Sequence, residues 1–117
     1  MKLYAYDKCS TCKNAEKYLK EHKVSFEKLD IISNPPTVEV LKDILSKSGY
    51  KIKDLFNKSG QMYREMDMKS KIDNMSEDDL LDLLSKNGKL VKRPILINND
   101  KFLVGFKEEL YKEFIIN

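Results

Sequence analysis

Two cysteines separated by two residues, Cys9 and Cys12, stand where a strand-like segment gives way to a helix-like one. The segment before them, Leu3 to Tyr6, is short and rich in residues that favour strands. From Cys12 onward, apolar residues recur every three or four positions, which is the spacing of an amphipathic helix. The chain is therefore predicted to begin with a strand, to turn at the cysteines and to enter a helix there.

The next segments predict a second strand and then a long helical block. Apolar and charged residues nearly alternate from Phe26 to Ile32, which favours a strand, and Asn34-Pro35-Pro36 ends it. From about residue 34 to residue 88 the apolar spacing is mainly helical, with Thr37 and Ser76 placed as N-caps. A β-α-β unit is therefore predicted first, followed by a helical insertion over about 34–88.

The end of the chain predicts a hairpin and a final helix. Residues 95–97 and 102–104 favour strands, and Asn98-Asn99-Asp100 between them has the composition of a turn. The spacing of apolar residues from Lys107 to Ile115 is helical. The predicted fold class is α/β, a thioredoxin-like (glutaredoxin-like) fold with a mixed four-stranded sheet and an inserted α-helical subdomain.

Length and charge favour one cytoplasmic domain. The 117 residues are enough for a single core, so one domain is expected over 1–117. Lys and Arg number 22 against 19 Asp and Glu, and the charges are interspersed, which argues against direct nucleic-acid binding. No apolar run approaches the length of a membrane span, and no basic leader with an apolar stretch opens the sequence. We expect a monomer in the cytoplasm, with no contact to a membrane.

The cysteine pair is the strongest candidate for chemistry. At a helix start, free backbone N–H groups and the helix dipole stabilise a thiolate, so Cys9 is the predicted nucleophile. Two intervening residues leave both sulfurs close enough to bond, so Cys12 is predicted to resolve a mixed disulfide formed at Cys9. The neighbours predicted to support the thiolate or to contact a substrate are Lys8, Ser10, Thr11 and Lys13.

Other interpretations of the cysteines are weaker or stay open. A zinc site needs about four ligands, and the sequence offers only two cysteines and one histidine, His22. Haem attachment would need a histidine directly after Cys12, where Lys13 stands. No metal site is therefore expected, whereas two inert cysteines packed in the core stay an open alternative.

Arg93-Pro94 is the second candidate feature. Arg93 and Arg64 are the only two arginines of a chain that otherwise uses lysine. A planar guanidinium binds oxyanions, carboxylates or a thiolate in a fork that lysine does not match. Arg93 is therefore predicted to assist Cys9, with an ordinary surface charge as the alternative, and Arg64 and Pro94 are predicted to help bind the substrate. A cis peptide bond before Pro94 would turn this loop toward the site.

Together these features resemble the ArsC/Spx family over essentially the whole chain. The residues that carry the resemblance are Cys9 to Cys12, Phe56 to Gly60 with Tyr63 to Glu65, Lys92 to Pro94, and Val104 to Phe106. The resemblance implies a thioredoxin fold with a helical insertion and a cis peptide bond at Pro94. It is stronger to the short arsenate-reductase-like branch of the family than to the Spx regulators.

In the arsenate reductases of this family, the nucleophile corresponds to Cys9 and one arsenate-binding arginine corresponds to Arg93. Two further arginines of those enzymes fall on Asn57 and Gly105 here, which argues against efficient arsenate reduction. Those enzymes also lack the second cysteine, so the presence of Cys12 implies an internal disulfide cycle.

The predicted function is that of a thiol–disulfide oxidoreductase that resembles arsenate reductase and acts on a small oxyanion or a disulfide. No bound cofactor is expected, and thioredoxin, glutaredoxin or glutathione is expected to supply the electrons. The alternative is a regulator resembling Spx, in which the same disulfide switches binding to the α subunit of RNA polymerase. A non-redox binding protein with inert cysteines is the third hypothesis.

Overall fold

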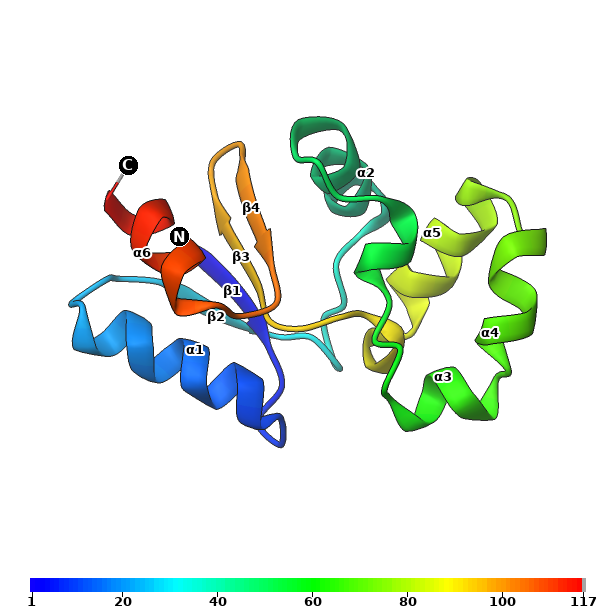
Figure 1. Cartoon of the computed structure of the whole chain (residues 1–117), viewed down its shortest axis with the longest axis horizontal. Helices are drawn as coiled ribbons and strands as arrows, with labels where there is room; N and C mark the ends of the chain where they lie inside the picture. Colours follow the sequence, from blue (N-terminus) through cyan, green and yellow to red (C-terminus); the bar gives the residue numbers. More distant parts are fainter. Residues whose placement is uncertain (117) are drawn as a thin grey trace.

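The computed structural model describes residues 1–116 and places six α-helices and three short 3₁₀ helices around four strands (Figure 1). The strands are β1 (Lys2–Ala5), β2 (Glu27–Asp30), β3 (Ile95–Asn98) and β4 (Lys101–Val104). The α-helices are α1 (Ser10–Glu21), α2 (Val38–Lys47), α3 (Gln61–Glu65), α4 (Met68–Lys71), α5 (Glu77–Lys86) and α6 (Glu108–Ile116). The 3₁₀ helices are η1 (Ile52–Leu55), η2 (Ile72–Asn74) and η3 (Gly88–Leu90).

The strands form one mixed sheet in the order β2-β1-β3-β4. β1 and β2 run parallel, with Leu3 opposite Lys28, as a crossover through α1 requires. β3 is antiparallel to β1, with Leu3 opposite Leu96, and it is also antiparallel to β4. The tight hairpin between β3 and β4 has Asn99 in the left-handed region, at φ 55. The predicted α/β class and mixed four-stranded sheet are confirmed.

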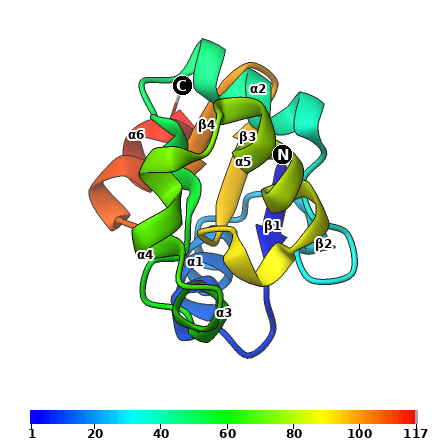
Figure 2. The same cartoon turned by 90° about the vertical axis from the view of Figure 1, so that its right-hand side faces the viewer.

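Side chains alternate between the two faces of the sheet, and each face has its own core. Leu3 and Ala5 point to the face covered by α1 and α6, where Cys12 and Tyr111 are buried with them. Tyr4 points to the opposite face, which the helical insertion covers. Figure 1 shows α1 and α6 on one side of the sheet and α2 to α5 on the other. Figure 2 views the molecule from the side of the insertion, with α3, α4 and α5 in front of the strands.

Side-chain caps fix the starts of the two longest helices of the insertion. The hydroxyl oxygen of Thr37 accepts the N–H of Val40 at 3.2 Å at the start of α2. The hydroxyl oxygen of Ser76 accepts the N–H of Asp79 at 3.1 Å at the start of α5. Both caps satisfy backbone donors that the first helical turn leaves free, and both were predicted from the sequence.

The chain returns from the insertion to the sheet through a close contact with the end of β2. Gly88 is buried at the start of η3, where an added Cβ would lie 1.9 Å from the carbonyl oxygen of Ile31. The N–H of Lys92 then donates to the carbonyl of Leu55 at 2.8 Å. These contacts fix the segment that leads into β3.

The first strand ends one residue earlier than predicted. β1 ends before Tyr6, because the Tyr6 carbonyl accepts the N–H of Cys9 at 3.0 Å in the turn toward α1. The helix begins within the cysteine motif, as predicted, with Cys9 as its cap and Ser10 as its first residue. Within the insertion, Asp67 adopts φ 51 and separates α3 from α4, a break that helical spacing does not predict. No helix among residues 1–116 is long and apolar enough to cross a bilayer.

Candidate functional site

Cys9 closes the turn between β1 and α1 and caps the helix. Its N–H donates to the carbonyl of Tyr6 at 3.0 Å, and its carbonyl accepts the N–H of Lys13 at 3.1 Å. With φ −100 and ψ 118 it occupies the N-cap position, and its half-exposed sulfur accepts the N–H of Cys12 at 3.4 Å. A sulfur atom thus takes the place that a hydroxyl or carboxylate oxygen usually has at a helix start.

Cys12 lies one turn further along α1 and is completely buried. Its side chain packs between α1 and the sheet, with Leu3 and Ala5, and its sulfur accepts the N–H of Tyr6 at 3.4 Å. Burial is the main reason why the pKa of Cys12 rises to about 12, and the neighbouring Cys9 raises it as well. Both cysteines are free thiols.

The pKa of Cys9 lies below the ordinary thiol value, although burial opposes ionisation. Partial burial is the largest single effect, and it raises the pKa of Cys9. The N–H of Cys12 donates to the Cys9 sulfur at 3.4 Å. The nearby Cys12 thiol and the charge of the Arg93 guanidinium lower the pKa of Cys9 further, and these effects together outweigh burial. The pKa of the outer thiol is therefore lowered, whereas that of the inner thiol is raised.

Arg93 reaches Cys9 from a segment far along the chain, and two further contacts hold it there. The centre of its guanidinium lies 5.0 Å from the centre of the Tyr6 ring, a cation–π distance. Its Nη1 donates to the carbonyl of Lys89 at 3.3 Å. Its Nε is buried and has no hydrogen-bond partner among residues 1–116. The peptide bond between Arg93 and Pro94 is cis, as the family resemblance implies.

A cleft of about 420 Å³ opens beside these residues. Thr11 and Arg93 line it, and because Arg93 contacts Cys9, the cleft is next to the outer thiol. Asn57 and Gly105, the positions at which the family resemblance implies arginines in the arsenate reductases, line it as well. Its other walls include Tyr50, Lys92, Phe106, Lys107, Leu110 and Tyr111. Cys9 itself is not among the lining residues, and Thr11 and Arg93 connect the cleft to the cysteine motif.

The other predicted residues near the cysteines differ in their access to the cleft. Ser10 and Thr11 are exposed in the first turn of α1, and of the two only Thr11 lines the cleft. Lys8 and Lys13 are exposed on either side of the cysteine motif, outside the cleft lining. In the part of the chain that the structure describes, no group of three or more His, Cys, Asp or Glu side chains could hold a metal ion.

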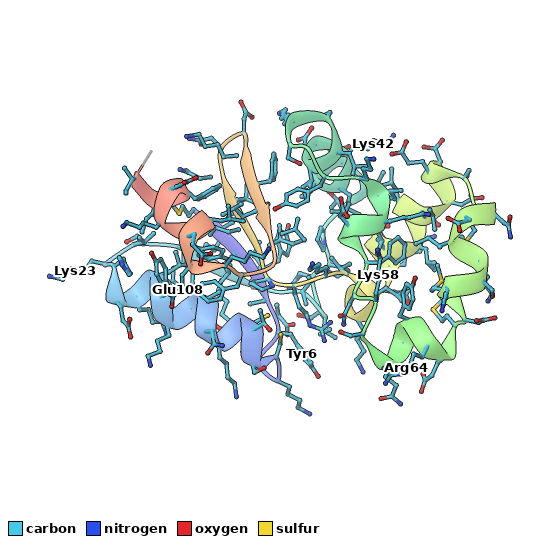
Figure 3. The ribbon with its side chains drawn as sticks, in the orientation of Figure 1. Tyr6, Lys23, Lys42, Lys58, Arg64 and Glu108 are labelled. Carbon is cyan, nitrogen blue, oxygen red and sulfur yellow. The ribbon has the colours of Figure 1, made fainter. Side chains whose placement is uncertain are left out.

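Pro94 and Arg64 have different places. Pro94 is buried, and its carbonyl accepts the N–H of Gly105 at 2.7 Å, which joins two walls of the cleft. Arg64 is exposed on α3, where its Nη1 donates to the carbonyl of Ser59 at 3.0 Å. Figure 3 shows Arg64 on the insertion and Tyr6 beside the start of α1. Of the two arginines, the structure brings only Arg93 to the cysteines.

Three residues around the site were not predicted from the sequence: Tyr6, Lys92 and Lys107. Tyr6 was assigned to the first strand, and its role as the surface beneath Arg93 depends on a contact between distant segments. Lys92 directly precedes Arg93 in the sequence, and this position next to a predicted site residue could have indicated that Lys92 lies at the site. Nothing in the sequence distinguishes Lys107 from the many other lysines of the chain, so its place at the site could not be predicted.

A capping cysteine, a buried second cysteine and an arginine before a cis proline make up the candidate site. The model of the ArsC family matches residues 4–114 of the chain. The chain belongs to the ArsC family. The predicted resemblance to the ArsC/Spx family is confirmed.

Relatives of this ArsC-family chain include an uncharacterized protein, a transcriptional regulator and a possible arsenate reductase. It is 44% identical over 110 residues to the uncharacterized protein YusI of Bacillus subtilis, covering 94% of this chain and 93% of that protein. It is 30% identical over 113 residues to the global transcriptional regulator Spx of Enterococcus faecalis, covering 97% of this chain and 84% of that protein. The crystal structure of a possible arsenate reductase from Streptococcus mutans superposes with a TM-score of 0.87 at 35% identity, covering 95% and 96% of the two chains.

Proposed function

We propose that the protein is a thiol–disulfide oxidoreductase in which Cys9 is the nucleophile, Cys12 resolves the intermediate and Arg93 stabilises the thiolate. The observation that carries this proposal is the position of the Cys9 sulfur, which caps α1, accepts the N–H of Cys12 at 3.4 Å and lies near enough to Arg93 for its charge to lower the pKa of Cys9. A sulfur held in this way has a lowered pKa, and the thiolate is the reactive form of cysteine. An inert pair of core cysteines would not need a guanidinium beside the outer one.

The proposed reaction begins with attack of the Cys9 thiolate on one sulfur of a disulfide substrate. The substrate S–S bond breaks, a bond forms between Cys9 and one half of the substrate, and the other half leaves as a thiolate that takes up a proton. Cys12 then loses its proton and attacks the Cys9 sulfur, which releases the second half. The substrate gains two electrons, and the protein ends with a Cys9–Cys12 disulfide.

The high pKa of Cys12 fits its proposed role in the second step. At the start its thiol donates a hydrogen bond to Cys9 and stays protonated, so only one nucleophile is present. Once Cys9 is in a mixed disulfide it no longer carries a negative charge, and one of the causes that raise the pKa of Cys12 disappears. A cytoplasmic dithiol protein, thioredoxin or glutaredoxin, is proposed to reduce the resulting disulfide.

Disulfides fit the site better than arsenate does. The Streptococcus mutans relative is described as a possible arsenate reductase, but in this chain Arg93 is the only arginine that lines the cleft. Asn57 and Gly105 supply no guanidinium at the two corresponding positions. Each charge-assisted contact missing there would be worth about 1.5–3 kcal/mol of oxyanion binding. Arsenate is therefore proposed as a poor substrate.

The experiment that tests the function follows turnover of hydroxyethyl disulfide, with thioredoxin, thioredoxin reductase and NADPH as the reducing system. The wild-type protein is expected to turn over, Cys9→Ser to be inactive, and Cys12→Ser to accumulate a mixed disulfide at Cys9 that mass spectrometry detects. Arsenate in place of the disulfide is expected to give little turnover. Failure of the wild type to react with the disulfide at neutral pH would rule the proposal out.

A regulatory role is the second candidate, favoured by the similarity to Spx of Enterococcus faecalis over 97% of this chain. In this alternative the Cys9–Cys12 disulfide changes a surface that binds the α subunit of RNA polymerase. Pull-down of the oxidised and the reduced protein with that subunit distinguishes the two functions. Binding that depends on the redox state would support regulation, and no binding in either state would remove it.

A further inference from the structure

The cleft beside Cys9 contains positive charges and no negative ones. Lys92, Arg93 and Lys107 line it, and no Asp or Glu among residues 1–116 does so. None of these three side chains forms an ion pair with a carboxylate in the part of the chain that the structure describes. Arg93 faces the Cys9 sulfur, so Lys92 and Lys107 are the two cations of the cleft that are left for an anionic ligand.

Lys92 lies over Gly105, where its ammonium can enter the cleft. A Cβ atom built on Gly105 would be 3.5 Å from Cε and 4.0 Å from Nζ of Lys92. Gly105 has φ +89, a conformation that side chains rarely adopt. The end of the Lys92 side chain therefore lies next to the place where a side chain of residue 105 would start. Gly105 has no side chain, so the positive charge at this place comes from Lys92. Its backbone is fixed by the hydrogen bond to Leu55 at 2.8 Å.

The hydroxyl groups of the two tyrosines that line the cleft form hydrogen bonds with the backbone. The hydroxyl of Tyr50 accepts the N–H of Val104 at 3.0 Å. The hydroxyl of Tyr111 donates to the carbonyl of Gly105 at 3.2 Å. Each of these two hydroxyls thus has a backbone partner, and the cations of the cleft add the charge that favours an anionic ligand.

The cleft also has an apolar wall, which an inorganic oxyanion would not need. Leu103, Phe106 and Leu110 line it, and Leu110 is 42% exposed, one of two large apolar side chains at the surface of residues 1–116. An apolar wall next to cations suits an organic molecule with a short alkyl chain and an acidic group.

We propose that this cleft binds an organic disulfide that carries a carboxylate, and that Lys92 is the positioning residue for that carboxylate. The proposal rests on the proposed function, because the disulfide has to react with Cys9. Cys9 attacks the substrate sulfur that lies beside it, one half leaves as a thiolate that takes up a proton, and Cys12 releases the other half. The disulfide gains two electrons, and the protein forms its internal disulfide.

The test compares three symmetric disulfides of similar length: dithiodipropionate, which is anionic, hydroxyethyl disulfide, which is neutral, and cystamine, which is cationic. The rate constant of the reduced protein with each is divided by that of mercaptoethanol with the same compound, which removes differences in leaving-group reactivity. The anionic disulfide is expected to react about tenfold faster than the cationic one, and added salt is expected to reduce this preference.

Variants of Lys92 assign the effect to one residue. Lys92→Gln is expected to lower the preference for the anionic over the cationic disulfide by about threefold and to leave the rate with the neutral one unchanged. Lys92→Arg is expected to restore the preference. Lys42→Gln, which removes an exposed lysine on α2 away from the cleft (Figure 3), is the control with the same net charge and is expected to behave like wild type.

A second measurement needs no reaction of the ligand. Suberate is the dicarboxylate in which methylene groups replace the two sulfur atoms, and it is expected to protect Cys9 from alkylation in the wild type but less in Lys92→Gln. Reaction with the neutral disulfide but no preference between the charged ones would overturn this inference and leave the proposed function standing. A preference that Lys92→Gln does not change would overturn the role of Lys92. No reaction with any of the three would overturn both proposals.

Discussion

The N–H of Cys12 lies 3.4 Å from the sulfur of Cys9, so the side chain that starts α1 is also the predicted nucleophile. The hydrogen bond has a structural and a chemical effect at once. It satisfies a backbone donor of the first helical turn, and it stabilises negative charge on the sulfur. The two cysteines consequently differ in exposure and in acidity, although only two residues separate them.

This difference predicts distinct pH profiles for alkylation of the two thiols. Only the thiolate reacts, so each rate rises with pH through the pKa of its own thiol. In Cys12→Ser, the remaining Cys9 is expected to be alkylated rapidly at neutral pH, with a midpoint below that of a free cysteine. In Cys9→Ser, Cys12 is expected to react slowly at neutral pH, because burial still raises its pKa although the contribution of Cys9 is lost. Iodoacetamide labelling followed by mass spectrometry measures both profiles, and coinciding midpoints would contradict the assignment.

Arg93 provides a second prediction, because it is one of the groups that lower the pKa of Cys9. Arg93→Gln removes its charge and is expected to raise the pKa of Cys9, so that alkylation at neutral pH becomes slower. Arg93→Lys keeps the positive charge but lacks the planar arrangement of N–H donors of the guanidinium. Its pH profile of Cys9 alkylation is expected to lie between those of the wild type and Arg93→Gln.

The matched control for Arg93 is the other arginine. Arg64→Gln removes the same charge from α3, where the guanidinium donates to Ser59, and is expected to leave the pKa of Cys9 unchanged. The same alkylation profiles report all three variants. A shift in Arg64→Gln as large as that in Arg93→Gln would mean that net charge alone, and not contact with the sulfur, sets the acidity of Cys9.

Much of the fold was predictable because its signals are local. Thr37 directly precedes the first apolar residue of its helix, Ser76 precedes an acidic first turn, and both are N-caps in the structure. The hairpin was predictable from the turn composition around Asn99, whose φ is positive. The break at Asp67 was not, because the left-handed residue interrupts an otherwise helical apolar spacing. The start of α1 within the cysteine motif was predicted from the spacing of apolar residues, although cysteine is not among the usual caps.

The candidate site was predictable only in part, because its residues come from distant segments. The cysteine pair can be recognised from spacing alone, and Arg93 stood out as a rare arginine. The support of Arg93 by the Tyr6 ring exists only after the insertion has returned to the sheet. The position of Lys92 over Gly105 depends in the same way on long-range packing.

The helix caps give a third prediction, on stability. Ser76→Ala is expected to lower the free energy of unfolding by about 1 kcal/mol, because the N–H of Asp79 loses its partner. Ser76→Asn retains a side-chain acceptor and is expected to recover most of this loss. Urea unfolding followed by circular dichroism measures the difference. Equal stability of the alanine and asparagine variants would show that the cap contributes nothing.

The last prediction concerns Gly88, where the insertion meets β2. An added methyl group would lie 1.9 Å from the carbonyl oxygen and 2.8 Å from the carbonyl carbon of Ile31, so backbone atoms would have to move. Gly88→Ala is therefore expected to lower the free energy of unfolding by about 2–4 kcal/mol. Gly49→Ala is the matched control, because an added Cβ there meets nothing within 4 Å.

At Gly49 the substitution acts mainly on the unfolded chain. Alanine has less backbone freedom than glycine, so Gly49→Ala is expected to change stability by less than about 1 kcal/mol, in the stabilising direction. The contrast between the two glycines separates the effect of close packing from the effect of chain entropy. If Gly88→Ala unfolds at the same urea concentration as Gly49→Ala, then the end of β2 and the start of η3 are not in the close contact that fixes the segment before Arg93.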